Sequence, residues 1–350
     1  MKVIIFAVAL IAAINALTDE ETEIVRRAQT TLLKETQNLA LAFGGPEIKL
    51  ADASEFEGFK QKFGKTYADK NEEAIRFQIF RVNQYIAAYY QMFEQGTARY
   101  GVTKFSDLSP DEFKLMYRNA QFDLRPTAQA APITTAAPAE YDWRQHGAVT
   151  DVKNQGQCGS CWAFSTTGNI EGQWFLKKGK LISLSEQELV DCDKVDQGCN
   201  GGLPSQAYKE IMRLGGMVTE QSYPYTARNG QCHMNQGNIV VTINGSISIS
   251  QDEGQMASWC AANGPISIGI NAAAMQFYMG GVSHPWKFMC NPDNLDHGVL
   301  IVGYGTQNNQ PYWIVKNSWG KNWGENGYYL AYRGDGTCGL NKMCTSATVA

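Results

Sequence analysis

The nine cysteines of this 350-residue chain are unevenly distributed, and no other feature of the sequence constrains the fold as strongly. None occurs in the first 157 residues, and all nine lie between residues 158 and 344. Such usage favours disulfide bonds and an oxidising compartment, and an odd number leaves one thiol over. The sequence therefore predicts two regions of different character, the second of which holds the disulfides.

The N-terminal segment and the net charge indicate which broad class of protein this chain belongs to. Residues 1–17 start with Lys2, continue with an apolar run from Val3 to Ile14 and reach the small Ala16, which is the pattern of a secretory signal peptide. A buried N-terminal strand or helix is the alternative. The net charge is −4, so a nucleic-acid partner is not expected. No apolar run approaches the length of roughly 18 residues that a membrane span needs, and we expect none.

The cysteine-free region, 19–118, is charged and rich in helical patterns. Steps of three and four place six residues on one face of a helix predicted over 71–93, namely Glu72, Arg76, Phe80, Asn83, Ala87 and Gln91. The segment Tyr100–Asp107 alternates and predicts a short strand, followed by a helix that begins near Pro110. Residues 120–140 contain three prolines and predict an exposed linker open to proteases, with an ordinary surface loop as the alternative.

The region from residue 140 onward changes from helical to β-like patterns. Helices are expected at 161–176 and at 184–191, where Ser185 and Glu188 form a capping-box pattern. Alternating or apolar segments bounded by glycine predict strands at 264–270, 297–304, 311–316 and 327–332. The expected fold class is therefore α+β, with a helical half followed by an antiparallel, barrel-like β half.

The most specific chemical signal is the segment Gln155-Gly-Gln-Cys158-Gly-Ser-Cys161-Trp. Cys161 opens a predicted helix, and the positive end of the helix dipole lowers the pKa of a thiol and favours the nucleophilic thiolate. The small residues before it let a substrate backbone approach. A redox or metal-binding C-x-x-C motif is the alternative, but no second pair with zinc spacing follows.

A nucleophilic cysteine needs a base and fixed hydrogen-bond donors. His297 is the candidate base, because it opens a glycine-bounded apolar strand 136 residues after Cys161, whereas His146, His233 and His284 lie in polar or turn contexts. Asn317 can orient the imidazole without adding charge, and Trp319 can shield that bond from water. Gln155 can offer its side-chain amide to a developing oxyanion, together with the backbone N–H of Cys161. For each residue the alternative is a structural or surface role.

These motifs resemble the papain family of cysteine proteases over residues 140–350, which includes Gly-Cys199-Asn-Gly-Gly202, Asn-Gly-Pro265 and Cys338-Gly-Leu. The helical row spells E-R-F-N-A-Q, the variant typical of cathepsin F-like prosegments. The segment Tyr100–Asp107 is similar to the prosegment element G-x-N-x-F-x-D, with Thr103 in place of Asn. The resemblance implies a signal peptide at 1–17, a propeptide at 18–138 (inhibitory prosegment 56–115, linker 120–138) and a mature two-domain protease at 139–350.

The resemblance also implies disulfides, a substrate pocket and a glycan site. The family pairs are Cys158–Cys199, Cys192–Cys232 and Cys290–Cys338, with Cys161 free; Cys260 and Cys344 then form a fourth pair or stay as two buried thiols. Asn244 in Asn-Gly-Ser is a candidate glycosylation site. By position, the groove for the substrate residue two before the scissile bond includes Gly201, Gly202, Leu203, Pro204, Gly269, Leu295, Gly298 and Met343.

The function expected from this resemblance is that of a cysteine endopeptidase made as a secreted zymogen. The pocket holds no acid, so we expect preference for leucine, valine or aromatic residues, and no insertion resembles the occluding loop of exopeptidase relatives. Expected partners are peptide substrates, the chain's own prosegment and cystatin-type inhibitors of a monomeric enzyme in the lysosome or outside the cell. Neither a cofactor nor a metal is expected. A catalytically silent binding homologue is the alternative.

Overall fold

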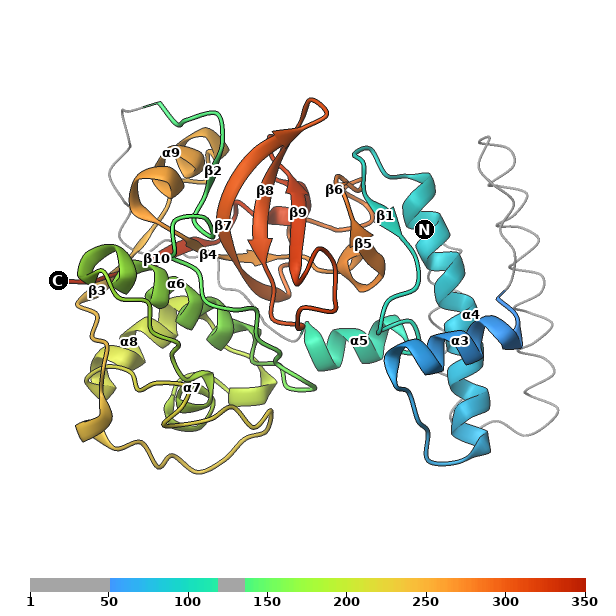
Figure 1. Ribbon diagram of the computed structural model, residues 1–350, viewed down its shortest axis with the longest axis horizontal. Helices are drawn as coiled ribbons and strands as arrows, with labels where there is room; N and C mark the ends of the chain where they lie inside the picture. The colour runs from blue at the N-terminus through green and yellow to red at the C-terminus, as the bar shows by residue number, and fades with distance from the viewer. Residues whose placement is uncertain (1–50, 119–135) are drawn as a thin grey trace. The chain divides into compact units, whose positions relative to one another are not determined.

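The computed structural model describes residues 51–118 and 136–350 (Figure 1). The expected signal peptide and most of the expected linker lie outside these ranges. The chain divides into two compact units. Among the described residues, the first contains 51–94, 99–113 and 276–279, and the second contains 95–98, 114–118, 136–275 and 280–350. Each is described separately.

The first unit is built on two helices, α3 (Ala53–Phe63) and α4 (Lys70–Met92). Asp52 caps α3 through a capping box with Glu55, and Asp69 caps α4. Between the helices lies an aromatic core that contains Phe56, Phe59 and Phe80. The expected helix over 71–93 is confirmed, and three residues of its row (Phe80, Asn83 and Ala87) are buried.

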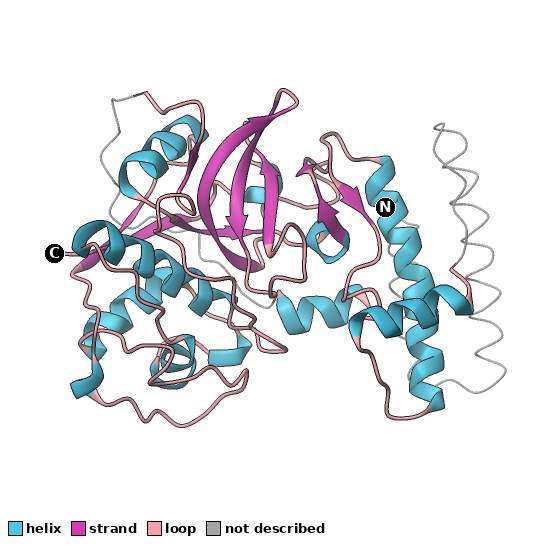
Figure 2. Ribbon diagram, in the orientation of Figure 1, coloured by secondary structure: helices cyan, strands magenta, loops and turns pink. Residues whose placement is uncertain are grey.

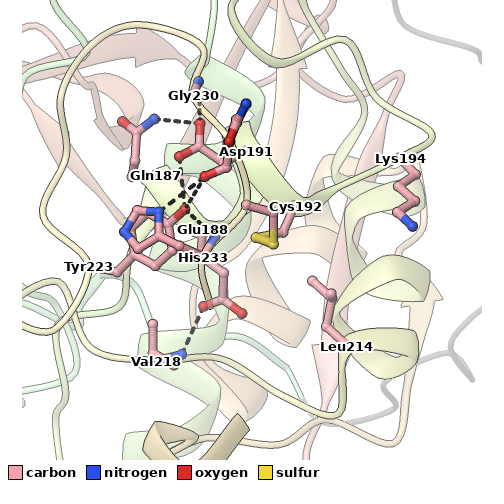
Figure 3. The surroundings of a disulfide bond; sticks show 12 residues. Gln187, Glu188, Asp191, Cys192, Lys194, Leu214, Val218, Tyr223, Gly230 and His233 are labelled. Carbon is pink, nitrogen blue, oxygen red and sulfur yellow. Dashed lines mark hydrogen bonds between the residues drawn. A yellow bond between two sulfur atoms is a disulfide. The ribbon is translucent and has the colours of Figure 1, made fainter. Parts of the chain in front are cut away.

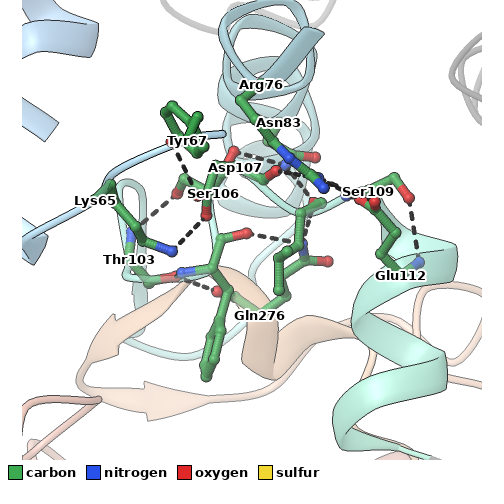
Figure 4. Close-up of polar contacts among 12 residues, drawn as sticks. Lys65, Tyr67, Arg76, Asn83, Thr103, Ser106, Asp107, Ser109, Glu112 and Gln276 are labelled. Atoms are coloured by element: carbon green, nitrogen blue, oxygen red, sulfur yellow. Dashed lines mark hydrogen bonds and ion pairs between the residues drawn. The ribbon is translucent and has the colours of Figure 1, made fainter. Parts of the chain in front are cut away.

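A buried polar cluster sits on the α4 face (Figure 4). The Asn83 amide donates to the carbonyls of Ser106 (2.8 Å) and Leu108 (2.7 Å), and Gln276 donates to the Leu108 carbonyl at 2.9 Å. These bonds hold residues 103–108 in successive turns, with Ser106 N–H donating to the Thr103 carbonyl at 3.0 Å. The strand expected over Tyr100–Asp107 is therefore wrong beyond Tyr100. Among the strands of the described ranges, β1 (Arg99–Tyr100) pairs only with β5 (Tyr278–Gly280).

Helix α5 (Pro110–Tyr117) begins at the expected proline. The Ser109 hydroxyl accepts from the Glu112 N–H at 3.1 Å, and the Glu112 carboxylate accepts from the Ser109 N–H at 2.8 Å. This reciprocal pair satisfies two donors at the helix start.

The second unit contains four α-helices and an eight-stranded sheet among its described residues (Figure 2). The helices are α6 (Cys161–Lys178), α7 (Glu186–Cys192), α8 (Pro204–Leu214) and α9 (Glu253–Asn263). Two of them, α8 and α9, were not expected from the sequence. Ser185 caps α7 as predicted, but Glu188 does not complete the capping box, because its carboxylate accepts from the Val218 N–H at 2.8 Å.

The sheet follows the order β3-β10-β4-β7-β8-β9-β6, with β2 added to β7. Its strands are β2 (Tyr141–Asp142), β3 (Gly245–Ser248), β4 (Ile266–Ile270), β6 (Val282–Ser283), β7 (His297–Gln307), β8 (Gln310–Lys316), β9 (Tyr328–Tyr332) and β10 (Cys344–Thr348). All pairings are antiparallel apart from β6 with β9. The four expected strands correspond to β4, β7, β8 and β9, and the α+β class is confirmed.

All nine cysteines lie in the described part of the chain. Three disulfides are present, Cys158–Cys199, Cys192–Cys232 and Cys290–Cys338, and these are the pairs that the family resemblance implied. Cys260 and Cys344 are both free and buried, so the expected fourth pair is wrong. The Cys344 sulfur lies 3.9 Å from the Met256 sulfur, one helical turn before Cys260 on α9.

Cys192 packs in an apolar cluster with Leu214 and Val218, and polar contacts centred on Asp191 lie next to it (Figure 3). Asp191 accepts from the Gln187 amide (2.8 Å), the Gly230 N–H (2.7 Å) and the Tyr223 hydroxyl (2.9 Å), and the Tyr223 ring stacks on His233. These contacts fix α7 to the loop that follows Tyr223. Among the described residues, no helix has both the length and the apolar character needed to cross a bilayer.

Candidate active site

Cys161 is the first residue of α6 and is completely buried. Its sulfur accepts a hydrogen bond from the backbone N–H of Gly298, at 3.3 Å. This close approach depends on the absence of a side chain at position 298. A Cβ on Gly298 would lie only 3.2 Å from the Cys161 carbonyl and the Trp162 backbone. Further along the same two elements, the Ser165 hydroxyl donates to the Val299 carbonyl at 2.7 Å. Helix α6 is thereby fixed against the start of β7.

His297, the first residue of β7, is also completely buried. One ring nitrogen, Nε2, lies 2.8 Å from Asn317 Oδ1, and Asn317 follows directly after β8. The imidazole stacks on the Trp319 indole with ring centroids 4.7 Å apart. Nε2 is therefore the ring nitrogen that bonds to Asn317, and Nδ1 takes no part in that bond. Asn317 Oδ1 also accepts from the Ser318 N–H at 2.8 Å, which fixes the amide orientation.

Gln155 has its side chain held at both ends. Its Oε1 accepts from the Ser318 hydroxyl (2.7 Å) and the Trp319 indole N–H (3.1 Å). Its Nε2 donates to the Cys158 carbonyl at 2.9 Å. An amide has two N–H donors, so one remains to be directed at an oxyanion.

The titration behaviour differs from the expectation of a lowered thiol pKa. Burial raises the pKa of Cys161 to about 12, although the Gly298 N–H lowers it, as do the N–H groups at the start of α6. Burial lowers the pKa of His297 to about 4, and the Arg118 charge lowers it further, against the opposing hydrogen bond to Asn317. Burial thus outweighs the expected lowering of the Cys161 pKa by the helix dipole, and it favours the neutral form of both Cys161 and His297.

Two residues that sequence reasoning missed lie at this site. The Arg118 guanidinium forms a buried ion pair with both carboxylate oxygens of Asp296, the residue before His297, and its Nη2 lies 3.4 Å from Asn271 Oδ1. The Tyr117 ring meets the Trp319 indole edge-on with centroids 6.1 Å apart. No local pattern marks either residue, because each contact joins segments far apart in sequence.

Two groups of the expected groove residues lie beside the start of α6, one through Gly298 and the other through Gly202. Gly269 on β4 is opposite Gly298 on β7, and its N–H donates to the Met343 carbonyl at 3.0 Å. Gly201, Gly202 and Leu203 precede α8, and a Cβ on Gly202 would lie 2.6 Å from the Trp162 indole. Leu203, Pro204 and Leu295 are buried.

The remaining predicted residues lie elsewhere. Asn244 is exposed, and its Oδ1 accepts from the Thr348 hydroxyl at 2.8 Å. His146 stacks on Tyr141, and His284 lies 3.0 Å from Asp335. Across residues 51–118 and 136–350, no group of three or more His, Cys, Asp or Glu side chains is placed to hold a metal.

Comparisons with known proteins agree with this geometry. Residues 137–348 match the model of the papain family cysteine protease, and residues 56–113 match the cathepsin propeptide inhibitor domain (I29). The chain belongs to the papain family of cysteine proteases. It thus combines a papain-family protease domain with a propeptide inhibitor domain.

Individual relatives support the same assignment. The chain is 51% identical to cathepsin F of Mus musculus over 84% of its length and 50% identical to cathepsin F of Drosophila melanogaster over 84%. These matches span 64% and 50% of the two relatives. Among solved structures, digestive procathepsin L 3 of Tenebrio molitor larval midgut superposes with a TM-score of 0.77 at 35% identity, covering 85% of this chain and 98% of that one. The recombinant stem bromelain precursor gives 0.76 at 34% identity, with coverage of 85% and 98%.

Proposed function

We propose that this chain is the zymogen of a secreted cysteine endopeptidase that cleaves proteins through an acyl-enzyme thioester. The observation that carries the proposal is the contact between Cys161 Sγ and the N–H of Gly298, the residue next to His297, together with the bond from His297 to Asn317. A thiol, an imidazole and an orienting amide in this order are the parts that nucleophilic catalysis needs.

In the processed enzyme, the Cys161 thiolate attacks the substrate carbonyl carbon, and the negative charge moves to the carbonyl oxygen. The free N–H of Gln155 Nε2 and the backbone N–H of Cys161 stabilise that oxyanion. Protonated His297 donates its proton to the leaving amine as the C–N bond breaks, which leaves the thioester. Neutral His297 then takes a proton from water, and the resulting hydroxide attacks the thioester carbon. The C–S bond breaks, which releases the acid and restores the Cys161 thiolate beside protonated His297.

The groove supports a preference for apolar residues two before the scissile bond. Its proposed walls, Leu203, Pro204, Gly269, Leu295, Gly298 and Met343, offer apolar surface or no side chain. Gly201 and Gly202 offer backbone hydrogen bonds to an extended substrate. A measured preference for arginine over leucine at this subsite would contradict this assignment.

The zymogen is inactive on this proposal because residues of the propeptide segment hold the site in a neutral, buried state. Arg118 binds Asp296 and disfavours protonation of His297, and burial disfavours the thiolate of Cys161. Removal of this segment restores solvent and permits the charged pair. Cystatin-type inhibitors are expected partners of the processed monomer, in a lysosomal or extracellular compartment, and Asn244 is a proposed glycan site.

The test is acid incubation of the purified zymogen followed by hydrolysis of a fluorogenic peptide with leucine before arginine. Activity should appear together with a loss of mass that corresponds to cleavage within 120–138. The Cys161→Ala variant and a cysteine-reactive epoxide should both abolish it. A correctly folded, fully processed protein without activity towards a library of peptides would overturn the proposal in favour of a silent binding homologue.

A further inference from the structure

The loop between α7 and α8 forms one side of the proposed groove and is closed on itself. The N–H of Gln197 donates to the Gly201 carbonyl at 2.9 Å. The N–H of Leu203 donates to Oδ1 of Asp196, also at 2.9 Å. Asp196 therefore ties together the beginning and the end of the turn that presents Gly201 and Gly202.

The same loop is attached to the nucleophile helix. The Trp162 indole N–H donates to the Gly198 carbonyl at 3.0 Å, and the Gly159 N–H donates to the Cys199 carbonyl at 2.8 Å. A Cβ on Gly202 would meet the Trp162 ring at 2.6 Å and the Asp196 Cβ at 2.8 Å. Gly202 is thus packed between Asp196 and the residue that follows Cys161, so a displacement of Asp196 displaces the groove wall.

Asp196 faces a second carboxyl group, that of Asp193 at the end of α7. Asp193 Oδ1 accepts from the N–H groups of Val195 (2.8 Å) and Asp196 (2.9 Å). The other oxygen of each residue, Oδ2, is buried and receives no hydrogen bond from any donor in the described part of the chain. Buried oxygens are rarely left in this state. A single proton between the two carboxyl groups would satisfy both, because a protonated carboxyl donates one hydrogen bond.

The electrostatic surroundings favour that proton. Burial, the charge of Asp193 and a hydrogen bond to Asp193 raise the pKa of Asp196 to about 8, while the Leu203 N–H lowers it. Glu210 on α8 adds to the rise. The Glu210 carboxylate forms a salt bridge with Arg213 at 2.7 Å. It also accepts a hydrogen bond from the backbone N–H of Lys194. The Lys194 side chain is exposed. The groups that face the pair are thus dominated by acids.

We propose that Asp196, as a protonated acid hydrogen-bonded to Asp193, is a positioning residue that holds Gly201 and Gly202 against Trp162 and so shapes the substrate groove beside Cys161. This inference rests on the proposed function of the groove. Loss of the shared proton at alkaline pH places two negative charges in contact and loosens the loop. We expect loosening of the loop to change KM and not kcat, because Asp196 does not touch Cys161, His297 or Asn317.

The test compares two substitutions in the processed enzyme. Asp196→Asn keeps an oxygen for the Leu203 N–H and supplies a permanent N–H to Asp193, so it imitates the protonated acid. Asp196→Ala removes both bonds and should raise KM about tenfold, with kcat changed by less than about twofold. The matched control is Asp151→Asn, whose side chain is 89% exposed.

The pH profile distinguishes positioning from a general structural role. The KM of the wild type and of the Asp151→Asn control should rise between about pH 7 and pH 9, whereas the KM of Asp196→Asn should stay low across this range. A wild-type KM that is flat over the range, or an Asp196→Asn enzyme that behaves like Asp196→Ala, would overturn the proposal.

A second measurement does not depend on catalysis. Infrared spectra of the unprocessed zymogen at pH 6 should contain a protonated-carboxyl C=O band that is absent from Asp196→Asn and disappears from the wild type above about pH 8. The wild-type minus variant difference separates this band from other buried acids. An inactive wild type with the band present would refute the proposed function alone, whereas absence of the band would refute the shared proton.

Discussion

Gln155 has its side-chain orientation fixed by a hydrogen-bond network. Its Oε1 is held by Ser318 and Trp319, so its amide hydrogens point in fixed directions before any substrate binds. We predict that Gln155→Ala lowers kcat by about 100-fold or more with a smaller change in KM, because an oxyanion donor acts mainly in the transition state. Steady-state kinetics of the processed enzyme measures both constants. The exposed neighbour variant Gln157→Ala should match the wild type. Equal losses in the two variants would contradict the assigned role.

In the proposed mechanism, Arg118 links inhibition by the propeptide segment to pH. The pKa of His297 is lowered from 6.5 to about 4 while the segment that carries Arg118 is docked. The free energy that neutral His297 contributes to this docking is therefore present above pH 6.5 and is lost as the pH falls towards 4. Acid should therefore weaken docking of the segment that carries Arg118. We predict that Arg118→Met, which also removes the cation bound to Asp296, makes the zymogen process faster and at higher pH, as measured by the fraction cleaved after incubation at each pH.

The control for this prediction is Arg144→Met, which removes an ion pair with Asp142 in which the arginine side chain is 36% exposed. Its processing profile should equal that of the wild type. A zymogen with Arg118→Met that processes at the wild-type rate and pH would show that the ion pair with Asp296 does not restrain the segment.

At the scale of elements, a packed and an open helical glycine allow the effect of side-chain packing on stability to be distinguished from that of helix propensity. A Cβ at Gly172 on α6 would lie 2.8 Å from Pro265 Cγ, whereas a Cβ at Gly58 on α3 would have nothing within 4 Å. We predict that Gly172→Ala destabilises the protein by about 1–3 kcal/mol through overpacking. Gly58→Ala should stabilise it by about 0.5–1 kcal/mol through helix propensity. Thermal unfolding of both variants in a Cys161→Ala zymogen tests the signs, and like signs would contradict the packing argument.

Elements with strong local signals could be predicted from the sequence. The helix over 71–93 follows from its periodic row, and β7 and β8 follow from apolar runs bounded by glycines. The segment 101–107 could not, because the backbone carbonyls of Phe105 and Ser106 accept from the side chains of Gln276 and Asn83 and not from a neighbouring strand. The absence of a bond between Cys260 and Cys344 depends on which turn of α9 faces β10, and a count of cysteines does not contain this information.

The candidate site shows the same division. Cys161, His297, Asn317 and Gln155 could be named from local motifs and from their resemblance to the papain family, and the structure connects them through short contacts. Arg118 and the Asp193–Asp196 contact could not be named, since tertiary packing alone brings their partners close. The expected depression of the Cys161 pKa considered only the helix dipole, whereas burial of the thiol outweighs it in this form.

For the whole molecule, buried acids make stability depend on pH. Burial raises the pKa of Glu188 to about 7 from 4.5. The stability that this group contributes is fully present below about pH 4.5 and is lost as the pH rises through 7. We predict that Glu188→Gln, which keeps the acceptor for the Val218 N–H, is neutral at pH 5 and stabilises the zymogen by about 1–3 kcal/mol at pH 8. Denaturant unfolding of the Cys161→Ala zymogen at both pH values measures this difference. The exposed Glu57→Gln control should show no such pH dependence, and an equal effect at pH 5 would contradict the prediction.

The burial of every free cysteine has a consequence for chemical reactivity. Cys161, Cys260 and Cys344 are all inaccessible, so the intact zymogen should resist alkylation and peroxide although it carries three thiols. Processing should expose one of them, and full unfolding should expose all three. Counting labelled cysteines by mass spectrometry before processing, after it and in denaturant should therefore give zero, one and three. The propeptide would then also protect Cys161 from oxidation, since it keeps this thiol reduced until the chain is cut.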